Sequence, residues 1–109
     1  MLDRRSFTLR EGSTVIGRED RRSPSDLQIC DPEVSRRSVR IEVTPDGSGS
    51  YVFTLIVMKA LNPVKVNGSV IAEGKNVRLN SGDLIVMGRT TLNFRTFGKS
   101  GNQGVLPSE

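Results

Sequence analysis

Apolar and polar residues alternate along short stretches of this chain, a pattern typical of half-buried β-strands. The clearest case is the stretch 38–43. There Val39, Ile41 and Val43 would share one face of a strand, with charged residues on the other. The stretch 51–58 is apolar on both faces, which favours a central strand covered on both sides. Further strands are predicted at 6–10, 26–29, 64–66, 70–71, 76–79, 84–87 and 91–95.

Turn signals separate these stretches. Asn67-Gly68 predicts a tight hairpin between 64–66 and 70–71. Ser81-Gly82-Asp83 predicts a second hairpin, between 76–79 and 84–87. No window shows the apolar spacing of a helix over three turns, and the 11 Gly and five Pro recur at turn-like intervals. The chain is therefore predicted to be all-β, as a sandwich or a barrel.

The length of 109 residues suits one domain. We expect that domain to span residues 1–97. The segment 98–109 has no core pattern and is expected to be a flexible tail or linker.

The composition narrows the possible functions. The chain has no His, so a His general base, a Ser-His-Asp triad and an imidazole metal ligand are excluded. Its one Cys cannot form an intrachain disulfide or a thiolate zinc site. We expect no enzyme activity, no metal and no cofactor. A lone Cys30, with no apolar run long enough for a membrane span and no visible secretion signal, favours a cytoplasmic location.

The basic residues are mostly arginine. The chain has 16 Lys and Arg against 12 Asp and Glu, a net charge of +4, and 12 of the 16 are Arg. Arginine grips phosphate or carboxylate oxygens with a planar, two-pronged group. Six of the arginines form adjacent pairs, Arg4-Arg5, Arg21-Arg22 and Arg36-Arg37, and each pair is also compatible with a solvated surface. A net charge of +4 interrupted by acidic residues gives little support to nucleic-acid binding.

Three segments carry candidate chemistry, each at the end of an expected strand: Ile16-Gly17-Arg18, the stretch 34–38 and the stretch 61–68. Together they offer guanidinium groups, a Ser hydroxyl, backbone donors and an Asn amide. That combination suits a dianionic phosphate, which has three acceptor oxygens, on a peptide.

Because these segments follow one another in this order within a chain predicted to be all-β, the chain resembles the forkhead-associated (FHA) domain family over roughly 7–97. No single motif is specific, but several in the family's order make the resemblance substantial. The matching segments are Gly17-Arg18, Ser35-Arg36-Arg37, Asn62, Asn67-Gly68 and 82–88.

The resemblance implies a β-sandwich of two twisted, mainly antiparallel sheets whose end loops bind phosphothreonine peptides. It implies that Arg18, Ser35 and Arg36 contact the phosphate. Arg37 is a further candidate, although neighbouring strand residues point in opposite directions. Asn62 would hydrogen-bond the main chain of the ligand. Without the family, Ser35 could equally be a turn or cap residue, and Asn62 a turn residue.

Other residues are implied to support the binding loops. Gly17 would let the backbone turn so that Arg18 points into the loop cluster. Asn67 and Gly68 would serve the hairpin turn more than the ligand. Ser38 occupies the position at which the family has a His that supports the loops from within.

A second departure from the family lies after Asn62. There the family's Gly-Thr is Pro63-Val64, so a backbone donor and a hydroxyl are lost.

Three functions remain open. The leading hypothesis is a phosphothreonine-dependent peptide- or protein-binding module in intracellular signalling. The alternative is a degenerate FHA-like domain that mediates phosphate-independent interaction or assembly. A lesser alternative is a basic β-domain that binds nucleic acid. The sequence does not identify the target peptide. Arg21-Arg22 and Lys59 or Lys65 are candidates for reading the residues beside a phosphate.

Overall fold

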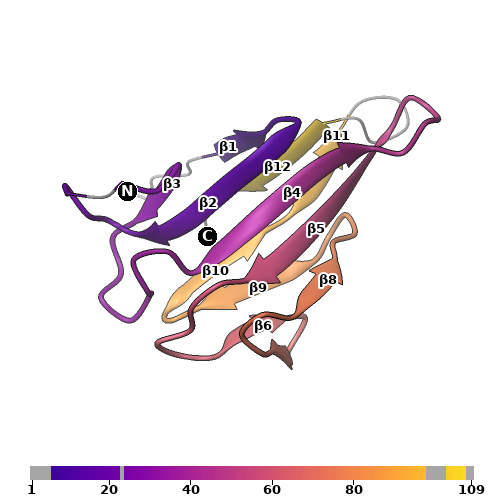
Figure 1. Cartoon of the computed structure of the whole chain (residues 1–109). Helices are drawn as coiled ribbons and strands as arrows, with labels where there is room; N and C mark the ends of the chain where they lie inside the picture. The colour runs from indigo at the N-terminus through magenta and orange to yellow at the C-terminus, as the bar shows by residue number, and fades with distance from the viewer. Residues whose placement is uncertain (1–5, 23, 98–102, 108–109) are drawn as a thin grey trace.

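The structure is a computed structural model that describes residues 6–22, 24–97 and 103–107 (Figure 1). Its elements are strands, and the described residues include no helix that could cross a membrane. The strands are β1 (Ser6–Leu9), β2 (Gly12–Arg18), β3 (Leu27–Ile29), β4 (Val39–Pro45), β5 (Tyr51–Val57), β6 (Val64–Val66), β7 (Ser69–Ile71), β8 (Asn76–Arg78), β9 (Leu84–Met87), β10 (Thr90–Asn93), β11 (Arg95–Phe97) and β12 (Gln103–Pro107).

These strands form a β-sandwich (Figure 1). One layer is a five-stranded sheet in the order β3-β2-β4-β5-β8. The other contains a four-stranded sheet, β10-β9-β6-β7, and a three-stranded sheet, β1-β12-β11. β3 runs parallel to β2, and the other paired strands are antiparallel. The predicted all-β sandwich of mainly antiparallel sheets is therefore confirmed.

The core lies between the two layers, where the alternation predicted it. Val39, Ile41 and Val43 of β4 are buried, and the residues between them face outward. Across the sandwich, the rings of Phe53 and Phe94 lie 5.0 Å apart at 60°, a tilted aromatic contact. Burial of this apolar surface holds the two layers together.

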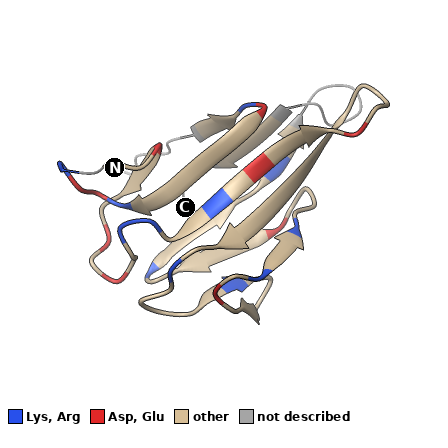
Figure 2. Ribbon diagram, viewed as in Figure 1, with Lys and Arg blue, Asp and Glu red and all other residues tan. Residues whose placement is uncertain are grey.

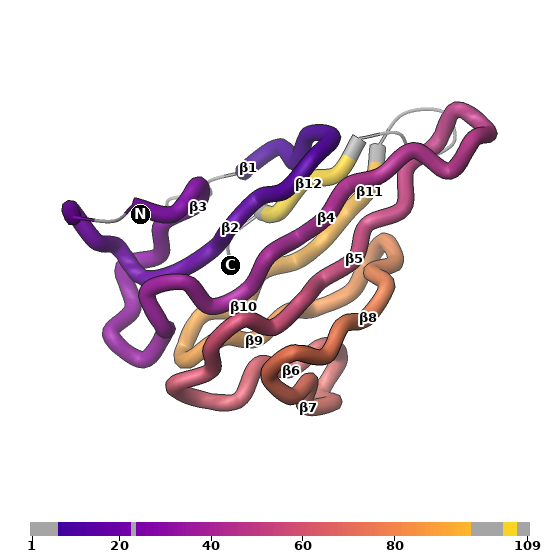
Figure 3. Tube along the Cα trace, viewed as in Figure 1, coloured from indigo at the N-terminus to yellow at the C-terminus, as the bar shows by residue number. Residues whose placement is uncertain are grey.

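The hairpin predicted at Asn67-Gly68 is confirmed: β6 and β7 pair directly (Figure 3). Both turn residues have positive φ, 51° at Asn67 and 85° at Gly68. Asn and Gly accept this left-handed conformation more readily than other residues, which is why the pair marks a tight hairpin.

The second predicted hairpin is wrong. β8 pairs with β5 in the five-stranded sheet, whereas β9 pairs with β6 and β10 in the other layer. The turn at 80–83 therefore carries the chain between layers. At this turn the Asp83 carboxylate accepts the backbone N–H of Asn80 at 2.7 Å and the side-chain amide of Asn67 at 2.9 Å. These bonds tie the turn to the β6–β7 hairpin.

The predicted strand at 91–95 consists of two strands in different sheets. β10 ends at Asn93 and β11 begins at Arg95, with the buried Phe94 between them. The hydrophobic pattern also did not give the extent of β2, because its first residues, Gly12-Ser13-Thr14, are small and polar.

The expected flexible tail is wrong for part of its length. Residues 103–107 form β12, which lies between β1 and β11 and pairs with both. Leu106 is 2% exposed and belongs to the core. Sequence alternation did not reveal this strand because it has few apolar residues and is preceded by Gly- and Ser-containing sequence.

We predict that Leu106→Ala lowers the free energy of unfolding by about 2–5 kcal/mol, the range for removing a buried leucine side chain. Val105→Ala, one residue away at a half-buried position, should cost about 1 kcal/mol or less. Urea unfolding followed by circular dichroism measures both. Equal small losses would contradict the placement of β12 in the core.

Candidate functional site

The end of β2 meets the loop between β3 and β4 without an intervening side chain. A Cβ built on Gly17 would lie 1.8 Å from the carbonyl oxygen of Arg36, a distance no real side chain can occupy. The backbone N–H of Arg18 donates to the Ser35 carbonyl at 2.8 Å, and that of Ser38 donates to the Ile16 carbonyl at 2.9 Å. Gly17 is therefore needed for close approach of two chain segments. The expected turn is not its role, since it lies inside β2 and is not among the glycines with positive φ.

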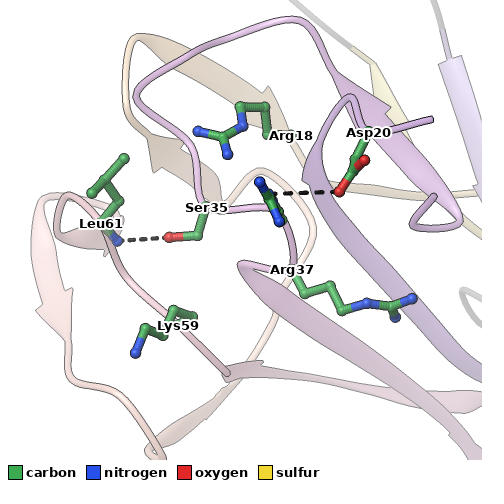
Figure 4. A pocket seen from close by; sticks show the side chains of 7 residues that line it. Arg18, Asp20, Ser35, Arg37, Lys59 and Leu61 are labelled. Atoms are coloured by element: carbon green, nitrogen blue, oxygen red, sulfur yellow. Dashed lines mark hydrogen bonds and ion pairs between the residues drawn. The ribbon is translucent and has the colours of Figure 1, made fainter. Parts of the chain in front are cut away.

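This contact places Ser35 at the centre of the site. Ser35 is 8% exposed, and its hydroxyl oxygen accepts the backbone N–H of Leu61 at 2.7 Å (Figure 4). Since a hydroxyl has one hydrogen and two lone pairs, this bond leaves the O–H of Ser35 to donate elsewhere.

A pocket of about 450 Å³ surrounds Ser35 at the end of the sandwich where the loops carry basic residues (Figures 2 and 4). Its charged side chains comprise four cations and one carboxylate, so its potential favours anions. The residues that line it are Arg18, Asp20, Ser35, Arg36, Arg37, Lys59 and Leu61.

The cations differ in their partners. Arg36 pairs with Asp20, its Nε lying 3.6 Å from the carboxylate, and its side chain is 71% exposed. Arg18 makes one long hydrogen bond, 3.4 Å from Nη1 to the Pro32 carbonyl. Within the described ranges, no carboxylate lies at ion-pair distance from Arg18 or Lys59. These two side chains are thus the cations most available to an anionic ligand.

The structure brings together four of the predicted ligand-binding residues: Arg18, Ser35, Arg36 and Arg37. Arg37 lines the pocket but extends away from Ser35 (Figure 4). Asn62 is not among the pocket-lining residues. Its side-chain N–H donates to the Glu33 carbonyl at 3.0 Å, which ties the β5–β6 loop to the β3–β4 loop.

The predicted supporting residues are placed as follows. Ser38 is 2% exposed, and its carbonyl accepts the N–H groups of Met58 and Lys59, which joins the start of β4 to the end of β5. Asn67 and Gly68 form the β6–β7 turn and are not among the residues that line the pocket. Val64, where the family has a threonine, is completely buried and packs in the core.

Sequence reasoning missed Asp20 and Leu61 as pocket residues. Asp20 pairs with the exposed Arg36, and a carboxylate in a loop among arginines does not stand out in the sequence as part of a binding pocket. Of the residues considered for reading positions beside a phosphate, Lys59 lines the pocket, whereas Lys65 and Arg21-Arg22 are not among its lining residues. The backbone bond from Lys59 to Ser38 is a tertiary contact that no local pattern reveals.

Asp31 anchors the β3–β4 loop to the opposite layer. Its carboxylate accepts the N–H of Glu33 at 2.9 Å, the N–H of Arg89 at 2.8 Å and the hydroxyl of Thr90 at 2.7 Å. The Thr90 hydroxyl, with the backbone donors of Glu33 and Arg89, holds the pKa of Asp31 below its ordinary value. Gly88 allows this approach, since a Cβ there would lie 2.9 Å from the Glu33 Cβ.

Fold and site together define a class: a β-sandwich binding module with a cationic, hydroxyl-containing pocket formed by loops at one end. The family model of the FHA domain matches residues 14–88. The chain therefore belongs to the FHA domain family, as its sequence motifs predicted.

Solved structures agree with this assignment. The FhaA FHA domain, complexed with the intracellular domain of Rv3910, is 26% identical to this chain, with a TM-score of 0.61 over 94% of this chain and 87% of its own. An FHA domain from a structural and functional analysis of phosphothreonine-dependent FHA domain interactions is also 26% identical, with a TM-score of 0.61 over 96% and 84%.

A third structure shares the fold at lower identity. The FHA-2 domain of the Mycobacterium tuberculosis ABC transporter Rv1747 has a TM-score of 0.61 at 23% identity, over 93% of this chain and 77% of its own. The comparison with curated proteins finds no match.

We predict that Gly17→Ala destabilises the fold by about 1–3 kcal/mol or more, because the added methyl group collides with the backbone of the β3–β4 loop. Ser13→Ala, at an exposed position of the same strand, should change stability by less than about 1 kcal/mol. Thermal unfolding compares the two variants. A Gly17→Ala protein as stable as Ser13→Ala would contradict the close approach.

We predict that Asp31 makes stability depend on pH in acid. Because its pKa is lower in the folded than in the unfolded state, its contribution is present above the unfolded-state pKa and is lost as the pH falls through the folded-state pKa. Asp31→Asn should therefore lower stability at neutral pH and flatten the decline in stability as the pH falls through and below the unfolded-state pKa of an aspartate. Denaturant unfolding across this range provides the measurement.

Asp46→Asn is the matched control, since Asp46 also has a lowered pKa, due first to the Ser48 hydroxyl, but lies in the β4–β5 loop. The Asp31 variant should shift the amide NMR signals of residues 33–36, and the Asp46 variant should not. Identical spectra at 33–36 in both variants would count against Asp31 as the anchor.

Proposed function

We propose that this chain is a phosphothreonine-dependent peptide-binding module, with the phosphate bound beside Ser35. The observation that carries the proposal is the hydrogen bond from the Leu61 N–H to the Ser35 hydroxyl oxygen. It fixes the hydroxyl at the pocket and leaves its hydrogen for an acceptor. A phosphate oxygen is such an acceptor.

The charges around Ser35 support the same ligand. Arg18 lies on one side of Ser35 and Lys59 on the other (Figure 4), and neither has a carboxylate partner among the residues the structure describes. A dianionic phosphate between them would receive a hydroxyl and two cationic donors. Each charge-assisted hydrogen bond is worth about 1.5–3 kcal/mol. The threonine preference rests on membership of the family.

Asn62 retains a role beside the phosphate in this proposal. Its amide N–H is used by the Glu33 carbonyl, but its carbonyl oxygen takes no hydrogen bond from a described residue. That oxygen is available to accept an N–H from the main chain of the ligand. We further propose that the module acts in signalling inside the cell, where a free, exposed Cys30 is compatible with a reducing compartment.

The other two hypotheses gain less support. Nucleic-acid binding by stacking needs exposed aromatic rings, and Phe53 and Phe94 are buried against each other. Phosphate-independent binding has one observation in its favour, the pairing of Arg36 with Asp20, which partly neutralises one pocket cation.

We predict that a phosphothreonine peptide binds and that its unphosphorylated twin does not. Arg18→Ala and Lys59→Ala should each weaken binding, by about tenfold for Arg18, since each removes a charge-assisted contact. Ser35→Ala should weaken it at least as much, because it also leaves the Leu61 N–H without its acceptor. Fluorescence anisotropy with labelled peptides measures the affinities.

Arg78→Ala removes the same charge from an exposed position on β8 and should leave the affinity nearly unchanged. Melting temperatures confirm that each variant is folded. Equal binding of the two peptides to the wild-type protein would overturn the proposal and favour phosphate-independent interaction.

A further inference from the structure

Leu61 is an apolar side chain in a pocket otherwise lined by charged residues and a serine. It is 62% exposed, the most exposed of the large apolar residues in the part of the chain that the structure describes. Single exposed leucines are common on protein surfaces and need no explanation by themselves. Leu61 differs from such residues in its position, because it lies beside the Ser35 hydroxyl that would contact a phosphate.

The loop that carries Leu61 is fixed at three consecutive residues. The N–H of Ala60 donates to the Glu73 carboxylate at 2.8 Å, the N–H of Leu61 to the Ser35 hydroxyl at 2.7 Å, and the side chain of Asn62 to the Glu33 carbonyl at 3.0 Å. These bonds fix the backbone of residues 60–62 beside Ser35. The exposed leucine side chain therefore starts from a fixed point of the pocket rim.

The residues that follow add to this constraint. Pro63 fixes its own φ, and Val64 is completely buried in the core. The loop thus runs directly from the exposed Leu61 into the sandwich. An apolar side chain on a loop that is already ordered gains the free energy of burial on binding without the entropic cost of ordering that loop.

We propose that Leu61 is a specificity-determining residue that selects phosphothreonine ligands with an aliphatic side chain close to the phosphothreonine. This rests on the proposed function, because Leu61 and the phosphate would share one pocket. The bond from the Leu61 N–H to the Ser35 hydroxyl keeps the two contacts close, so the aliphatic residue lies within a few positions of the phosphothreonine.

The test is a double-mutant cycle between protein and peptide. The probes are short Gly-Ser peptides with one phosphothreonine, in which leucine replaces a flanking residue at one position at a time. At one or more positions, leucine should improve binding to the wild-type protein by about fivefold, as expected for burial of part of an aliphatic side chain. In Leu61→Ala the same leucine should change the affinity less than about twofold, because its contact is missing.

Val70→Ala is the matched control, since Val70 is 59% exposed but lies on β7 and is not a pocket-lining residue. It should retain the full preference for leucine. The affinity of each protein for the parent Gly-Ser phosphopeptide is its own reference, so the effect of the flanking leucine is measured as a ratio within one protein.

The outcomes separate the two proposals. If no flanking leucine improves binding, or if Leu61→Ala retains the whole preference, this inference is wrong while phosphate-dependent binding stands. If none of the phosphopeptides binds better than its unphosphorylated twin, the proposed function itself fails.

Discussion

The site depends on the absence of a side chain at Gly17. The backbone of the β3–β4 loop at Arg36 lies very close to β2. A Cβ on Gly17 would lie 1.8 Å from the Arg36 carbonyl oxygen. Backbone hydrogen bonds on both sides, to Ser35 and from Ser38, hold this contact. Because Arg18 follows Gly17 directly and Ser35 precedes Arg36, one steric constraint brings a guanidinium group, a hydroxyl and a second cation to the same pocket.

The rest of the site is held by bonds that cross between loops and layers. Asp31 binds the β3–β4 loop to Arg89 and Thr90 of the opposite layer, and Asn62 binds it to the β5–β6 loop. Both kinds of bond need the sandwich to be assembled, because their partners lie 29 to 59 positions apart in sequence. The geometry of the pocket is thus a consequence of the packed core, and local loop sequence alone does not determine it.

This dependence explains which features the sequence could predict. Alternation along 38–43 and the Asn67-Gly68 turn follow from local periodicity and φ preference, and both are confirmed. The 80–83 turn resembles a hairpin in sequence because Gly82 marks a turn but carries no information on which strands it joins. The strands on its two sides pair in different layers, β8 with β5 and β9 with β6 and β10. Lys59 and Leu61 reach the pocket through backbone bonds to Ser38 and Ser35, which leave no trace in composition or spacing.

Two positions that depart from the family pattern are buried, whereas two positions that match it line the pocket. Ser38 and Val64 are buried, at 2% and 0% exposure, so these substitutions change how the loops and core are packed. Arg18 and Ser35, the groups that would face a phosphate, match the family and line the pocket. Ser38 still joins β4 to β5 and to β2, because it does so through its backbone, which is independent of side-chain identity. Loss of the family's histidine therefore leaves the main-chain framework of the pocket in place, since the bonds that build this framework are made by the Ser38 backbone.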